Sequence, residues 1–191
     1  MSVTTVAKPI RRKFANVDAF EKWAFQQEFG YEFVNGKAIK KNMIKYLEYF
    51  ILRKLMRLFT KTKAYSQNSE LLTETMIKLP NDKIRVPDMA YFTDAQIIEA
   101  SEGGSPIPEF VIEFLSKNDT LEEVEEKIND YFASGVKVVW YINLKRETIY
   151  VYTSPKKINV CSGDDIVSAS PVVDDYTFPG KEIFKKELAL S

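Results

Sequence analysis

Residues 110–143 carry the pattern that most limits how this chain can fold. The run of large apolar residues at 110–116 is typical of a buried strand. Thr120 and Glu123, three positions apart, have the spacing of a capping box, which predicts the start of a helix. A second, nearly continuous apolar run at 136–143 predicts a strand buried on both faces. This succession of strand, helix and strand predicts a βαβ unit, and with it an α/β fold.

Periodicity, caps and turns predict the other elements. Asn35-Gly36 between apolar residues is the preferred dipeptide of a type I′ turn, which predicts a hairpin over 31–40. We expect helices at 17–29 (capped by Asn16 or Asp18), 41–59, 121–134 and about 183–188, strands at 70–79, 84–93, 110–116 and 136–143, a loop at 94–108, and a closing hairpin from 148–153 and 158–161.

The chain length bounds the domain organisation. With 191 residues and no internal repeat or linker, the chain suits one domain of ordinary size. Residues 1–16 lack periodicity and are expected to form a flexible arm, and residues 17–191 are expected to form the single domain. No segment reaches the roughly 18–20 unbroken apolar residues of a membrane span, so no membrane partner is expected.

The composition excludes several kinds of chemistry. The chain has no histidine, which rules out Ser-His-Asp and Cys-His catalysis and zinc sites of the Cys/His kind. Its single cysteine, Cys161, allows no internal disulfide; together with the lack of an export signal, this indicates a cytoplasmic location. Any chemistry must come from carboxylates, lysine, hydroxyl groups and a hard metal ion held by oxygen ligands.

The helix expected at 41–59 has one apolar stripe and one basic side. The stripe consists of Ile44, Leu47, Ile51, Leu55 and Leu58, and the basic residues are Lys41, Lys45, Arg53, Lys54, Arg57, Lys61 and Lys63. The basic side is either a solvated helix face or a surface that contacts phosphates. The net charge of zero does not decide between them, because charge can be segregated by face.

Two acids stand alone inside apolar strands. Glu113 interrupts the run at 110–116, and Asp88 lies in the strand expected at 84–93. Each has an ordinary interpretation: a buried ion pair for Glu113, and a turn or capping acid for Asp88. Adjacent strands lie about 4.8 Å apart, so the two carboxylates can also converge on one cation. Such an oxygen-ligand site suits Mg²⁺ or Mn²⁺.

Lys127 completes this set of residues. It lies on the helix that follows the strand of Glu113 and flanks the buried stripe of that helix. Its ordinary interpretation is an ion pair with Glu123 one turn earlier.

Four blocks of the sequence, in matching order and spacing, resemble the PD-(D/E)XK (restriction-endonuclease-like) nuclease superfamily. The closer resemblance is to a bacterial restriction-endonuclease family long catalogued as a domain of unknown function, and it runs from about residue 20 to residue 184. The blocks are 31–37 (YEFVNGK), 85–91 (RVPDMAY), 108–116 (PEFVIEFLS) and 126–143, which contains EKI, GV and WYIN.

The resemblance implies a central mixed β-sheet flanked by helices and metal-dependent cleavage of phosphodiester bonds. Asp88 and Glu113 match the two acids of the motif and would hold Mg²⁺ or Mn²⁺, with the backbone carbonyl of Phe114 as a third ligand. The superfamily lysine normally stands two positions after the second acid, where this chain has Leu115. Lys127 matches the place from which this family supplies its lysine. The nearer substitute, Lys117, ranks lower, and Glu32 is a further candidate acid.

These residues point to a metal-dependent endonuclease that acts on DNA, with DNA as the expected partner and a homodimer as an expected assembly. The alternative is a catalytically inactive nuclease-fold module that binds DNA or protein. The retained Asp88, Glu113 and Lys127 favour the enzyme.

Overall fold

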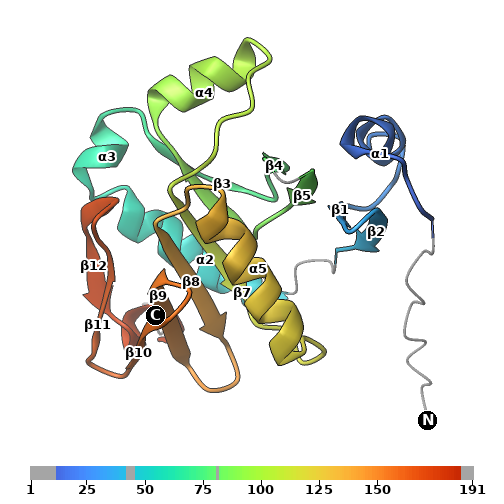
Figure 1. The fold of residues 1–191 in the computed structure, drawn as a ribbon. Helices are drawn as coiled ribbons and strands as arrows, with labels where there is room; N and C mark the ends of the chain where they lie inside the picture. Colours follow the sequence, from blue (N-terminus) through green and yellow to red (C-terminus); the bar gives the residue numbers. More distant parts are fainter. Residues whose placement is uncertain (1–11, 42–45, 81, 186–191) are drawn as a thin grey trace. The chain divides into compact units, whose positions relative to one another are not determined.

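A computed structural model describes residues 12–41, 46–80 and 82–185 of the chain (Figure 1). The chain divides into two compact units: unit 1 comprises Met1–Met43 and Met76–Val86, and unit 2 comprises Ile44–Thr75 and Pro87–Ser191. The single domain over 17–191 stays a prediction, and residues 1–11 of the expected arm lie outside the described residues. Within the described part of the chain, none of the helices is both long and apolar enough to cross a membrane.

Unit 1 is a four-stranded antiparallel sheet with one helix. The strand order is β2-β1-β5-β4, with β1 Tyr31–Val34, β2 Lys37–Lys40, β4 Ile77–Leu79 and β5 Lys83–Arg85. The predicted hairpin is confirmed, because Asn35 and Gly36 both have the positive φ that a type I′ turn requires. Helix α1 covers Val17–Ala24, shorter than expected, and Asn16 is its cap.

An aromatic core holds unit 1 together. Phe20 and Phe33 are almost fully buried and their rings stack, with centroids 5.2 Å apart. Phe14 packs edge-on against both rings, and its backbone N–H donates to the carbonyl of Gly36. The last residues before α1 are therefore fixed against the hairpin.

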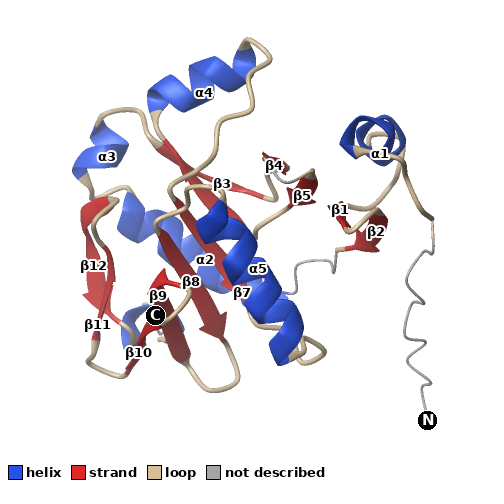
Figure 2. Cartoon of the chain, in the orientation of Figure 1, coloured by secondary structure: helices blue, strands red, loops and turns tan. Residues whose placement is uncertain are grey.

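Unit 2 is built on a six-stranded mixed sheet (Figure 2). The order is β10-β9-β8-β7-β6-β3, with β3 Glu70–Thr73, β6 Met89–Phe92, β7 Phe110–Phe114, β8 Val138–Asn143, β9 Thr148–Ser154 and β10 Lys157–Ser162. Strands β7 and β8 are parallel and joined by helix α5, which confirms the βαβ unit. The other pairs in this sheet are antiparallel.

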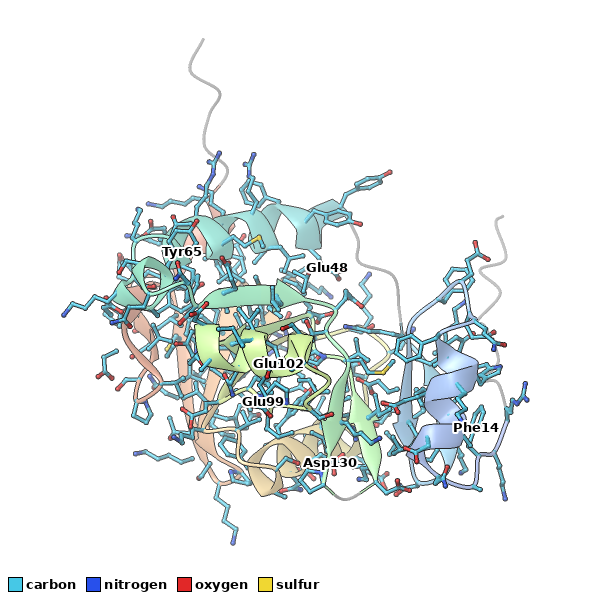
Figure 3. The ribbon with its side chains drawn as sticks, turned by 90° about the horizontal axis from the view of Figure 1, so that it is seen from above. Phe14, Glu48, Tyr65, Glu99, Glu102 and Asp130 are labelled. Carbon is cyan, nitrogen blue, oxygen red and sulfur yellow. The ribbon has the colours of Figure 1, made fainter. Side chains whose placement is uncertain are left out.

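Helices α2 and α5 cover opposite faces of this sheet. Seen from above, α2 (Tyr46–Phe59), which carries Glu48, and α5 (Leu121–Ala133), which carries Asp130, lie on either side of the strands (Figure 3). The α2 face includes the aromatic residues Phe110 and Trp140. Because side chains alternate along a strand, Glu113 points to the face opposite Ile112 and Phe114. The carboxylate of Glu113 thus lies on the α5 side.

The C-terminal part adds a hairpin that the sequence did not predict. Strands β11 (Ile166–Ala169) and β12 (Val173–Pro179) pair with each other, and Tyr176 and Phe178 join the core on the α2 face. The hydroxyl group of Tyr176 donates to the backbone carbonyl of Leu55 in α2 at 2.9 Å. Two short helices, α3 (Lys63–Ser66) and α6 (Lys181–Phe184), complete the unit.

The expectation of a loop throughout 94–108 is wrong. Helix α4 occupies Asp94–Ser101, because Thr93 and Gln96 form a capping box that starts a helix there. The helix ends before Gly103, whose φ of 92° favours glycine.

The expected strands 70–79 and 84–93 are each divided in two. Glu74 adopts a positive φ after β3, and Pro87, which has no N–H to donate, separates β5 from β6.

Two expectations for the basic helix also need correction. Leu47, expected in the buried stripe, is 49% exposed, and Lys54, expected on the basic side, is buried. The buried residues of α2 are Ile51, Leu52, Lys54, Leu55 and Phe59, so Ile51 and Leu55 of the predicted stripe are buried and the buried face extends to Leu52 and Phe59. Ile44 and Lys45 lie outside the described residues.

Cys161 is expected to react slowly with thiol reagents in the native protein. Its side chain is fully buried and its thiol donates to the carbonyl of Ile166 at 3.4 Å. Burial raises the pKa of the thiol, so less of the reactive thiolate is present at a given pH. A colorimetric thiol assay at pH 8 should show slow labelling without denaturant and rapid labelling of one thiol in guanidinium chloride. Equally rapid labelling in both conditions would contradict the packing of β10 against β11.

Candidate active site

Strands β6 and β7 bring the two predicted acids to the same end of the sheet. Their antiparallel register ends at the pair of Met89 and Ile112; Asp88 forms the bend directly before β6, and Glu113 is the next residue of β7. Both acids are buried. Two buried carboxylates therefore lie at this end of the sheet, one directly before β6 and one in β7.

Asp88 is fixed by a backbone donor of β7. Its Oδ2 accepts a hydrogen bond from the N–H of Phe114 at 2.6 Å. The carbonyl of Asp88 accepts the N–H of Glu74, so the residue is also held from the β3 side. The bond to Phe114 fits the capping interpretation of Asp88, and it also ties the carboxylate to the residue directly after Glu113.

Glu113 receives two side-chain hydrogen bonds from helix α5. Lys127 Nζ donates to Oε1 at 3.1 Å, and the hydroxyl group of Tyr131 donates to the same Oε1 at 2.5 Å. Lys127 and Tyr131 are four positions apart, one helical turn, so they project from the same side of α5. The capping box of Thr120 and Glu123 starts the helix immediately after the loop that follows β7.

The structure brings Lys127 to Glu113. The carboxylate of Glu123 accepts from the backbone N–H and hydroxyl group of Thr120. Lys117 lies exposed in the loop between β7 and α5, and Leu115 has no charge to offer. The Lys127–Glu113 pair satisfies both interpretations of Glu113, the buried ion pair and the catalytic pair. A purely structural Lys127–Glu113 ion pair would not require a second buried acid nearby, and Asp88 is such an acid.

Glu32 lies in unit 1 and has its own partners there. Its Oε2 accepts from Arg85 Nη1 at 3.0 Å and its Oε1 accepts from the N–H of Val86 at 3.2 Å. Both side chains of this pair are buried. This geometry describes an ion pair within unit 1, and a metal-binding role for Glu32 stays a prediction.

The electrostatics of the loop before α5 are set by Asp119. Desolvation of its carboxyl group raises the pKa, while the hydrogen bond from the N–H of Ser116 and the positive charge of Lys127 act in the opposite direction. The charge of Glu113 adds to the upward shift. Asp119, Lys127 and Glu113 thus interact electrostatically at the start of α5.

The available donors fit a hard divalent cation. Two carboxylates and the Phe114 carbonyl are oxygen ligands of the kind that Mg²⁺ and Mn²⁺ prefer, and Mg²⁺ usually keeps several waters beside one or two carboxylates. Among residues 12–41, 46–80 and 82–185, no group of three or more His, Cys, Asp or Glu side chains is arranged to hold a metal. A site here would therefore depend on the backbone carbonyl and on water.

Tyr131 is the residue that the sequence reasoning missed. The signal that could have found it is its four-residue spacing from Lys127, because this places a buried hydroxyl group beside the lysine. A buried tyrosine hydroxyl normally finds a hydrogen-bond partner, and here that partner is Glu113.

A family model described as "Uma2: Putative restriction endonuclease" matches residues 17–179. The chain belongs to the Uma2 family. No curated protein matches the chain.

A crystal structure of "a putative nuclease belonging to DUF820" from Anabaena variabilis is similar to this Uma2 chain. The TM-score is 0.76 at 21% identity, with 88% of this chain and 97% of that chain covered. This likeness confirms the mixed α/β fold expected from the resemblance. A cryoEM structure of a DrdV–DNA complex matches with a TM-score of only 0.34 at 14% identity, covering 60% of this chain and 12% of that one, and carries no argument.

Proposed function

We propose that this chain is a metal-dependent endonuclease that hydrolyses phosphodiester bonds in DNA. The observation that supports this most is that Asp88, directly before β6, bonds to the backbone next to Glu113 in the neighbouring strand β7, with Lys127 donating to Glu113. Membership of a restriction-endonuclease family supports the reaction class. The absence of histidine from the chain agrees with a reaction that uses acids, a lysine and a metal ion.

The residues divide the work by their chemistry. Asp88, Glu113 and the Phe114 carbonyl would hold Mg²⁺ or Mn²⁺, which when bound makes water acidic enough to attack at neutral pH and polarises the phosphate. Lys127 keeps its ammonium group at the carboxylate of Glu113, where it can orient a water or neutralise charge that develops on phosphate oxygens. The N–H of Phe114 holds Asp88 in place.

DNA as the partner, a homodimer as the assembly and the cytoplasm as the location remain parts of the proposal. The exposed arginines of α2, Arg53 and Arg57, lie on a helix that packs on the sheet face opposite Glu113. A phosphate contact by this basic helix stays a prediction, and it would involve a surface apart from the acids.

The metal requirement gives the direct test of the enzyme. Purified protein should cleave plasmid, linear or single-stranded DNA in Mg²⁺ or Mn²⁺ and lose this activity in EDTA, because the carboxylates act only through the ion. Restoring excess Mg²⁺ should restore cleavage. Gel electrophoresis of the products is the measurement. Cleavage that persists in EDTA, or that is equal in Glu113→Ala, would contradict the proposal.

One observation favours the alternative, a catalytically inactive module of the same fold. Glu113 already has a lysine and a tyrosine as partners, as a purely structural ion pair would. Calorimetric titration with Mn²⁺ separates the two functions. The enzyme should bind Mn²⁺ and lose binding in Asp88→Asn, whereas no binding, or binding unchanged in this variant, would favour the module.

A further inference from the structure

Two donors from α5 meet at one oxygen of Glu113, and they differ in rigidity. Tyr131 is fully buried, and its hydroxyl group lies 2.5 Å from Oε1. The side chain of Lys127 is 22% exposed and its Nζ lies 3.1 Å from the same atom. Lysine has a flexible four-carbon stem, whereas tyrosine has two χ angles and a ring held by its neighbours. Tyr131 is therefore the donor that fixes where Oε1 lies.

The bond from Tyr131 is of the strong kind. Hydrogen bonds from a hydroxyl group to a carboxylate run about 2.5–2.7 Å and are roughly twice as strong as those between neutral groups. Glu113 itself is only 3% exposed, so water does little to compensate its charge. The hydroxyl group of Tyr131 supplies one fixed hydrogen-bond donor where solvent would otherwise supply mobile ones. It therefore orients the carboxylate of Glu113 as well as stabilising its charge.

We propose that Tyr131 is a positioning residue for the metal site, acting through Glu113. This inference rests on the proposed function. Tyr131 holds Oε1 on the α5 side, and this sets the orientation of the carboxylate relative to Asp88, which lies directly before the neighbouring strand β6. Hydrogen-bond partners that orient a metal-ligating side chain typically affect metal affinity by about 10- to 100-fold.

The chain offers a matched control in Tyr176. It is also almost fully buried, and its hydroxyl group also donates one hydrogen bond, to the Leu55 carbonyl on the opposite face of the sheet. Tyr131→Phe and Tyr176→Phe each remove one buried hydroxyl group and keep the ring. They differ in whether the lost bond ends on Glu113.

Calorimetric Mn²⁺ titration of the full chain tests the proposal. Tyr131→Phe should weaken Mn²⁺ binding by about 10- to 100-fold, and Tyr176→Phe should leave it unchanged. Glu113→Gln should also weaken binding, and adding Tyr131→Phe to it should cause no further loss, because Tyr131 acts only through the charged carboxylate.

Three results would overturn the positioning role. The first is a Tyr131→Phe variant that binds Mn²⁺ with wild-type affinity. An equal loss in Tyr176→Phe, or a Tyr131→Phe chain that does not fold by circular dichroism, would assign Tyr131 to structure instead. Absence of Mn²⁺ binding to the wild type would refute the metal site itself and thereby the proposed function. This result is distinct from a failure of the positioning role alone, in which the wild type binds Mn²⁺ and Tyr131→Phe binds it equally well.

Discussion

Glu113→Gln is expected to reduce DNA cleavage by at least about 10²- to 10³-fold, the scale seen when one preorganised electrostatic group is removed from an active site. The substitution keeps the size of the side chain and an oxygen that can accept from Lys127 and Tyr131. It removes the negative charge that would bind the cation. The fold should persist, because Lys127 is partly exposed and its ammonium group can reach water.

The matched control is Glu123→Gln. It makes the same chemical change ten positions further along the chain, on the first turn of α5, where glutamine also completes a capping box with Thr120. Cleavage rates under single-turnover conditions and Mn²⁺ titrations should show a large loss for Glu113→Gln and none for Glu123→Gln. Equal activity of the two variants would rule out a role for Glu113 in the reaction.

Lys127→Met is expected to separate catalysis from metal binding. Cleavage should fall by about 10²- to 10³-fold, because the ammonium group that would neutralise phosphate charge is gone. Mn²⁺ affinity should stay the same or rise, because a positive charge 3.1 Å from Oε1 of Glu113 repels a cation bound to that carboxylate. Stability should fall by about 1.5–3 kcal/mol, the scale of a lost hydrogen bond to a charged group.

The directions in which the cleavage rate and the Mn²⁺ affinity change together identify the role of Lys127. Metal binding retained with cleavage lost is expected of a group that acts on the phosphate or the water. If Lys127→Met cleaves at the wild-type rate and is merely less stable, the Lys127–Glu113 pair is only structural. Urea denaturation with and without Mn²⁺ supplies the stability measurement and confirms binding independently of turnover.

The elements defined by local signals were predictable from the sequence. The Asn35-Gly36 turn and the capping box at Thr120 were both correct, because each depends on residues a few positions apart. The second capping box, at Thr93 and Gln96, is followed by a glycine-rich stretch typical of a loop, which is why the sequence predicts a loop where α4 forms. The β11–β12 hairpin depends on packing against α2 and β8, contacts with no counterpart in local sequence.

The acids of the candidate site were predictable from the sequence, but the hydrogen bonds that they accept were not. Asp88 and Glu113 are conspicuous as lone charges in apolar strands, and their placement at the same end of the sheet follows from strand pairing. The choice of Lys127 between Glu113 and Glu123 depends on how α5 lies across β7. Sequence spacing alone favoured Glu123, one helical turn before Lys127, and the hydroxyl group of Tyr131 could be assigned only once its direction was known.

The βαβ unit has a consequence for how the site assembles. Glu113, Lys127 and Tyr131 lie within one strand and the helix that follows it, with Glu113 and Tyr131 separated by 18 positions. Closing so short a loop costs little entropy, so this triad can form as soon as α5 docks on β7. Asp88 is brought to the site by a different contact, the pairing of β6 with β7. If the proposed site binds a cation, its affinity should therefore depend on the pairing of these two strands, and bound Mn²⁺ should slow hydrogen exchange at the Phe114 N–H more than within α5.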